Sequence, residues 1–82
     1  MQKIEVQVRF KNGLHSREAI QLVELSKQSQ SVIYLLKGDE KINTKSLIRI
    51  LTAQIKENEV INFEVDGIDE LEVKENLIRL FK

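Results

Sequence analysis

The residues best suited to chemistry lie in one short stretch, Asn12-Gly13-Leu14-His15-Ser16-Arg17. His15 is the only histidine of the chain, and the spacing of apolar residues changes just after it, which predicts that a helix begins at His15 or Ser16. Neutral imidazole is a competent nucleophile near pH 7. The first N–H groups of a helix lack partners and attract anions, so they would stabilise a phosphoryl group on His15. The alternative is that His15 is an ordinary surface or capping residue.

Arg17 would lie in the first turn of that helix. Its guanidinium could add charge-assisted hydrogen bonds to phosphate oxygens. We therefore take His15 and Arg17 as the candidate reactive pair, and the helix start at Ser16, Arg17 and Glu18 as the candidate phosphate-stabilising segment.

A second candidate is Ser46, at the predicted start of another helix. It could simply be an N-cap, whose hydroxyl accepts a backbone N–H bond. It could also be phosphorylated, because a phosphate at a helix N-terminus adds charge without unfolding the helix. Leu47, Ile48 and Leu51 follow, and they are either core residues or a docking patch for a protein partner.

Composition excludes several other classes of site. The 82 residues contain no cysteine and one histidine, which leaves no disulfide, cysteine nucleophile or zinc site, and no cofactor or metal is expected. Lys plus Arg and Asp plus Glu number 13 each, so the charge balance does not favour nucleic acid or an anionic membrane as the partner. No signal peptide or membrane-spanning run is recognisable, so we expect a cytoplasmic protein.

Alternating polar and apolar residues predict the strands. This pattern marks Gln2–Phe10 and Val60–Asp66, and a short β-rich run marks Ser31–Lys37. Gly38-Asp39 is a turn signal that leads into a returning strand over 40–43.

Apolar residues at helical spacing predict three helices. The first covers residues 16–27, and the second covers Leu47–Ile55 after a cap at Thr44–Ser46. Asp69, with Glu72 three residues on, predicts the capped start of the third helix. The apolar stripe of that helix consists of Val73, Leu77, Leu80 and Phe81.

The predicted order is therefore βαββαβα. Alternating strands leave one sheet face in water, which favours an antiparallel sheet with the three helices on its other face. We expect a single α+β domain over residues 1–82, built as a two-layer open-faced sandwich with four strands.

Three segments resemble the signatures of one known family, HPr, the histidine-containing phosphocarrier of the bacterial phosphoenolpyruvate:sugar phosphotransferase system. Residues 12–17 resemble its active-site signature, residues 43–48 the signature around its regulatory serine, and residues 65–70 the turn into its last helix. The three matches keep the family's spacing without gaps, and the resemblance covers essentially the whole chain.

The resemblance implies that His15 accepts a phosphoryl group on Nδ1 from enzyme I and passes it to sugar-specific EIIA domains, assisted by Arg17. It implies that a kinase/phosphorylase can modify Ser46, and that this form acts in carbon catabolite repression with a transcriptional regulator. A relay that docks with several partners in turn is expected to be a monomer. It would be a stoichiometric carrier with a phosphohistidine intermediate rather than a self-contained turnover enzyme.

The chain departs from the family pattern at four positions. Ser16 replaces the usual alanine and Glu18 the usual proline, while Arg49 and Gln54 stand where small residues are common. Glu18 would repel a phosphoryl group or pair with Arg17, and either effect would slow phosphoryl acceptance. The alternatives to a working carrier are a regulatory protein acting through Ser46 and an HPr-like module with a partner in another pathway.

Overall fold

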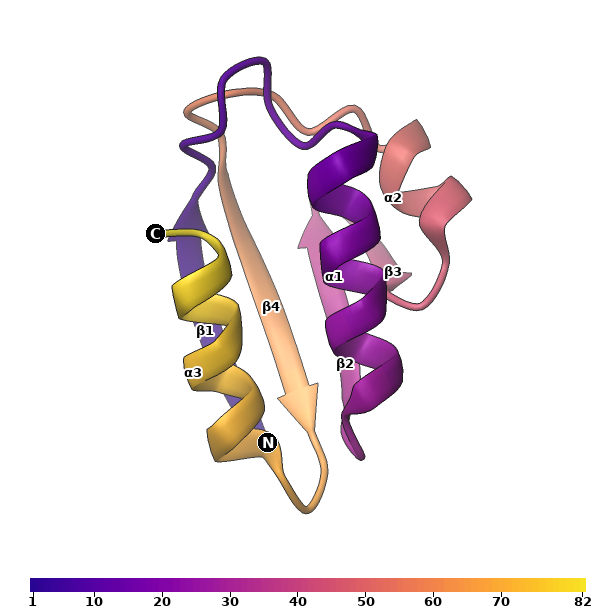
Figure 1. The fold of residues 1–82 in the computed structure, drawn as a ribbon, viewed down its shortest axis with the longest axis vertical. Coiled ribbons are helices and arrows are strands. Elements are labelled where there is room, and N and C mark those ends of the chain that lie inside the picture. The colour runs from indigo at the N-terminus through magenta and orange to yellow at the C-terminus, as the bar shows by residue number, and fades with distance from the viewer.

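A computed structural model describes all residues, 1–82, and has the predicted order βαββαβα (Figure 1). The strands are β1 (Gln2–Gln7), β2 (Val32–Lys37), β3 (Glu40–Asn43) and β4 (Val60–Asp66). The helices are α1 (Ser16–Gln28), α2 (Leu47–Thr52) and α3 (Glu70–Leu80). None of these helices combines the length and the apolar character that crossing a bilayer requires.

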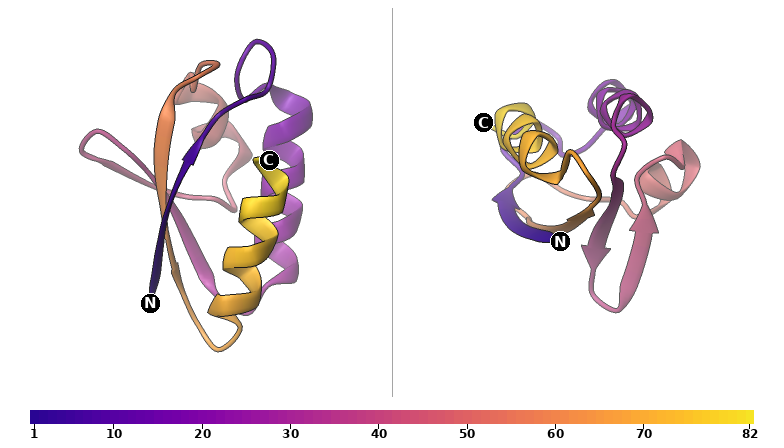
Figure 2. Two further views of the ribbon diagram at one scale, coloured as in Figure 1. Left: turned by 90° about the vertical axis from the view of Figure 1, so that its left-hand side faces the viewer. Right: turned by 90° about the horizontal axis from the view of Figure 1, so that it is seen from below.

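The four strands form one antiparallel sheet in the order β1-β4-β2-β3. Figure 2 shows α1 and α3 side by side over one face of the sheet, with α2 at the end of the same layer beside β3. The predicted open-faced sandwich is therefore confirmed. The pairing of β1 with β4 brings the first strand of the chain beside the last one.

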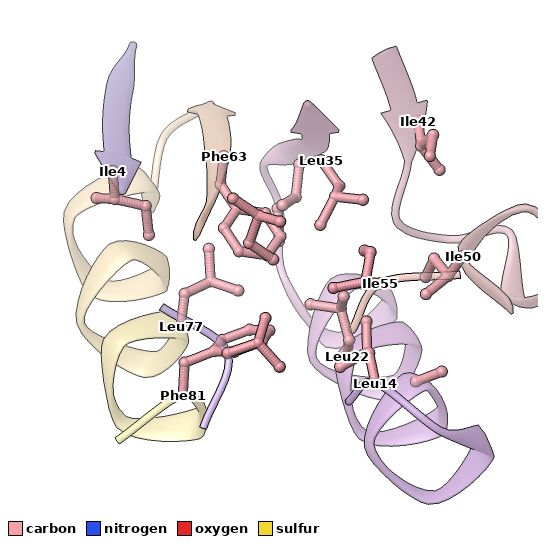
Figure 3. Close-up of a cluster of buried hydrophobic side chains, with 14 of the residues drawn as sticks. Ile4, Leu14, Leu22, Leu35, Ile42, Ile50, Ile55, Phe63, Leu77 and Phe81 are labelled. Atoms are coloured by element: carbon pink, nitrogen blue, oxygen red, sulfur yellow. The ribbon is translucent and has the colours of Figure 1, made fainter. Parts of the chain in front are cut away.

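A single apolar core fills the space between the sheet and the helices. Alternate residues of each strand point inward, because side chains along a strand alternate between faces. Phe63 lies at the centre, and its ring centroid is 5.5 Å from that of Phe81, which follows α3 (Figure 3). The predicted α3 stripe is confirmed: Val73, Leu77 and Phe81 are buried, and Leu80 packs against them.

Two predicted elements extend three residues beyond their observed ends, and the strand predicted from Ser31 begins one residue later, at Val32. β1 ends at Gln7 rather than Phe10, because Val8 pairs with the turn before β4, donating its N–H to Glu59 at 2.8 Å. α2 ends at Thr52, and Ile55, which was predicted to lie in this helix, is buried beyond it. The chain leaves the helix at Gln54, whose φ of 53° is incompatible with a right-handed helix.

The prediction that the Asp69 side chain caps α3 is correct for its position but wrong for its hydrogen bonds. Asp69 occupies the N-cap position, but its side chain makes no cap hydrogen bond. Its carboxylate instead accepts the Gln30 N–H at 2.9 Å and the Ser31 hydroxyl, which ties the start of α3 to the loop between α1 and β2. These two hydrogen bonds hold the pKa of the Asp69 carboxyl below its ordinary value of 3.8.

Candidate functional site

His15 is the N-cap residue of α1, and its side chain is exposed. Its extended backbone (φ −85°, ψ −177°) turns the chain into the helix, which begins at Ser16 as predicted. The first helical hydrogen bond runs from the Ala19 N–H to the His15 carbonyl at 2.8 Å, and the N–H groups of Ser16 and Arg17 have no protein acceptor. An anion bound to the imidazole would therefore lie next to unpaired donors at the positive end of a helix.

The loop before His15 is held against the segment that follows α2. Leu14 is buried and donates its N–H to the Ile55 carbonyl at 3.0 Å. Gly13 has a φ of +80°, and a Cβ at this position would collide with the Ile55 carbonyl and lie 2.9 Å from Lys56 Cα. Both segments meet at one end of the molecule in Figure 1. Nothing in the sequence indicated this long-range contact.

Arg17 and Glu18 do not pair with each other. Arg17 is exposed and forms no ion pair, whereas the half-buried Glu18 accepts the His15 N–H on Oε1 at 3.2 Å. Glu18 therefore binds back to the start of its own helix, as the glutamate of a capping box does. Of the two effects predicted for Glu18, the ion pair with Arg17 is not formed, and repulsion of a phosphoryl group stays a prediction; the Arg17 guanidinium is free.

Ser46 is the N-cap of α2, as one of its two interpretations predicted. Its hydroxyl oxygen accepts the Arg49 N–H at 3.4 Å, and its side chain is partly exposed. The exposed Arg49 guanidinium lies 3.7 Å from a carboxylate oxygen of Glu40. Both side chains of this pair are largely in water, where such pairs contribute little to stability.

A buried pair of hydroxyl groups fixes the segment before Ser46 to α1. The Thr44 and Ser26 hydroxyl groups bond with each other, and each also lies near a carbonyl oxygen, that of Ile33 at 3.0 Å from Thr44 and that of Leu22 at 2.9 Å from Ser26. Because each hydroxyl has one proton, one of the two donates to its carbonyl and the other donates to its hydroxyl partner. We did not predict this link. Ser26 falls on the apolar stripe of the first helix, and a serine there is the signal that would have indicated a buried hydrogen bond.

The three candidate docking residues differ in exposure. Ile48 is 74% exposed and Leu51 is 37% exposed, whereas Leu47 packs partly against the core. Ile20, on the neighbouring helix α1, is 43% exposed and was not among the predicted docking residues. The surface around α1 and α2 therefore carries exposed aliphatic side chains as well as the free guanidinium of Arg17.

Comparison with known proteins gives a consistent result over the whole chain. The family model described as the PTS HPr component phosphorylation site matches residues 2–82. The phosphocarrier protein HPr of Haemophilus influenzae is 32% identical over 76 residues, which cover 93% of this chain and 89% of that protein. The crystal structure of HPr from Thermoanaerobacter tengcongensis has a TM-score of 0.92 at 28% identity and covers 99% of this chain and 91% of that one.

A second kind of relative is also similar. The crystal structure of Crh, described as a catabolite repression protein of Bacillus subtilis that forms a swapped dimer, has a TM-score of 0.76 at 28% identity. It covers 99% of this chain and 93% of that one. With the family model matching all but the first residue, this chain belongs to the HPr family of the phosphoenolpyruvate:sugar phosphotransferase system.

Proposed function

We propose that this protein is a phosphocarrier that relays a phosphoryl group through His15. The lone pair of the imidazole Nδ1 attacks the phosphorus of phosphorylated enzyme I, a P–N bond forms, and the bond to the enzyme I histidine breaks. A nucleophilic group of a sugar-specific EIIA domain then attacks the same phosphorus, forms its own bond to it, and the P–N bond to His15 breaks. The protein would act in the cytoplasm as a monomer, a single domain over residues 1–82.

One observation carries this proposal: His15 is exposed at the N-cap of α1, beside the unpaired N–H groups of Ser16 and Arg17. A phosphoryl group on the ring would gain hydrogen bonds that the unmodified site leaves unfilled. The free Arg17 guanidinium is within the same turn and would add a mobile positive charge. The exposed Ile48 and Leu51 support transient docking of protein partners nearby.

The test is phosphoryl transfer from phosphoenolpyruvate and a cognate enzyme I, followed by phosphorus NMR for phosphohistidine. We expect a histidine-linked signal that disappears in His15→Ala, while Arg17→Ala retains it at a reduced rate. An ordinary HPr labelled alongside shows that the enzyme I is active. Absence of a signal from the folded protein in that mixture would contradict the proposal.

A second candidate is a regulatory protein that acts through phosphorylated Ser46. The similarity to Crh, a catabolite repression protein, favours it, as does the partly exposed Ser46 hydroxyl at the start of α2. Incubation with an HPr kinase/phosphorylase and ATP should phosphorylate the protein but not Ser46→Ala. The phosphorylated form should then bind a transcriptional regulator, and failure of both forms to bind would remove the support for this function.

A further inference from the structure

The end of the molecule opposite His15 carries two aliphatic side chains that the fold leaves in water. Ile68 is 86% exposed, more than any other large apolar residue of the chain, and Leu71 is 65% exposed. Together with Gln2 they line a shallow hollow of about 520 Å³ between the start of β1 and the first turn of α3. Figure 1 shows the β4–α3 turn at one end of the long axis and the start of α1 at the other.

Neither side chain is part of the hydrophobic core. Ile68 immediately precedes the N-cap Asp69, where an apolar residue often packs against the fourth helical residue as a hydrophobic staple. That residue is Val73, and its burial comes from other neighbours, because Ile68 remains almost fully exposed. Leu71 lies outside the buried stripe of α3.

The turn that presents these side chains is held in place by specific contacts. A Cβ on Gly67 would lie 2.5 Å from Ser31 Cα, so the turn packs directly on that loop. The Asp69 carboxylate accepts hydrogen bonds from Gln30 and Ser31, and Glu70 accepts the Gly67 N–H at 3.2 Å. A surface fixed before binding loses little conformational entropy when a partner docks.

The segment at this end of the molecule is acidic, whereas the rest of the chain has a net positive charge. Residues 66–75 contain five carboxylates and one lysine, a formal net charge of −4, so the rest of the neutral chain carries +4. Asp69 and Glu70 are engaged in the contacts above, and the N-terminal ammonium group lies 2.9 Å from Glu70 and 3.8 Å from Asp66. Glu72 and Glu75 are exposed and form no ion pair. Of the seven residues that line the hollow, Ile68 and Leu71 are the two apolar ones, and Asp69, Glu70 and Glu72 give it an acidic rim. An acidic rim around exposed aliphatic side chains favours a cationic partner both in approach and in binding.

We propose that the hollow lined by Ile68 and Leu71 docks a basic amphipathic segment of another protein, with its aliphatic side chains in the hollow and its Lys or Arg side chains on the acidic rim. This surface lies at the far end of the molecule from His15, so a partner bound here leaves the histidine accessible. The inference does not depend on the proposed phosphoryl relay.

The probe is a synthetic 14-residue peptide that presents leucines on one helical face and lysines on the other. A scrambled peptide of the same composition is the control ligand. We expect amide shifts in residues 67–72 on titration, followed by NMR, with affinity that falls as salt rises. Replacing both Ile68 and Leu71 by Ser should weaken binding at least tenfold, since the burial of two aliphatic side chains is lost.

The matched control variant is Ile78→Ser, which removes another exposed aliphatic residue of α3 outside the hollow. It should bind the peptide as the unmodified protein does, and Glu72→Gln should lessen the salt dependence. Shifts that map to α1 and α2, or equal affinity of the double variant, would overturn the proposal. It would also be overturned if sedimentation without peptide showed self-association that the double variant abolishes, because a second copy would then be the occupant.

Discussion

Replacing Gly13 by alanine tests whether the loop carrying His15 is held by its contact with the segment after α2. Gly13 has a φ of +80°, a conformation that costs other residues about 1–2 kcal/mol. The added Cβ would also meet the Ile55 carbonyl and the backbone of Lys56. To relieve that collision, the loop before His15 must move away from the segment after α2. The hydrogen bond from the Leu14 N–H to the Ile55 carbonyl is then lost, and Leu14 becomes partly exposed.

The lost hydrogen bond contributes about 1 kcal/mol, and partial exposure of one leucine costs about as much. With the backbone strain, Gly13→Ala should lower the free energy of unfolding by about 3 kcal/mol. Domains of this size are stable by about 4–12 kcal/mol, so the loss is a large fraction of the total. Urea denaturation followed by circular dichroism measures it as a shift of the midpoint.

Gly38→Ala is the matched control, because Gly38 also has a positive φ of +59° but no atom lies within 4 Å of the position of an added Cβ. It should cost only the backbone strain, about 1–2 kcal/mol. Gly13→Ala should also slow phosphoryl acceptance by His15, whereas Gly38→Ala should not. Equal destabilisation by the two variants would refute the inferred role of the contact with Ile55 and Lys56.

Three further predictions follow from single contacts. Glu18→Gln should accelerate phosphoryl acceptance several-fold, because an uncharged amide no longer repels the incoming phosphoryl group. Quenched-flow labelling measures the rate of phosphoryl acceptance. The control is Glu24→Gln, at an exposed position of the same helix, which should leave this rate unchanged. A rate for Glu18→Gln that equals the unmodified one would contradict repulsion by Glu18. Thr44→Val should cost about 1–2 kcal/mol in urea denaturation, because the buried hydrogen bond between the Thr44 and Ser26 hydroxyl groups is lost. A smaller effect in the double variant with Ser26→Ala than the sum of the two single effects would confirm the coupling. The pKa of Asp69 is lowered in the folded state by the Gln30 N–H and then by the Ser31 hydroxyl, so the stability it adds is present above pH 3.8 and is lost as the pH falls through its folded pKa. Asp69→Asn should therefore be less stable than the unmodified protein near neutral pH, and the difference should shrink in acid; a difference that does not change with pH would argue against this bond.

Local patterns were sufficient to predict the elements of the fold. The period-two alternation of β4 and the apolar stripe of α3 reflect which faces are buried, and burial dominates the choice of structure in an amphipathic segment. Element ends were harder to predict, because they depend on partners distant in sequence. β1 stops at Gln7 since its partner strand begins only at Val60, which nothing within residues 2–10 encodes.

The candidate site shows the same difference between local features, which were predictable, and features that depend on side-chain conformation or distant residues, which were not. The sequence was sufficient to predict that His15 lies at a helix start and that Ser46 is an N-cap, because the signals lie within a few residues of each position. The role of the Glu18 side chain was not, since its carboxylate can reach either Arg17 or the His15 N–H, and the choice depends on the rotamer. The contact between Gly13 and Ile55 joins positions more than 40 residues apart, and only the folded chain brings them together.

The contacts on the two sides of α2 explain how one short helix can be held firmly beside α1. Isolated helices of six residues are unstable in water, so tertiary contacts must fix α2. Before it, Thr44 bonds to Ser26 in the last turn of α1. After it, Ile55 accepts the N–H of Leu14 in the loop that precedes α1. The helix with Ser46 at its start is thus attached at both ends to the element that presents His15. A charge added at Ser46 should therefore act on partners through a surface shared with His15, without requiring any rearrangement of the fold.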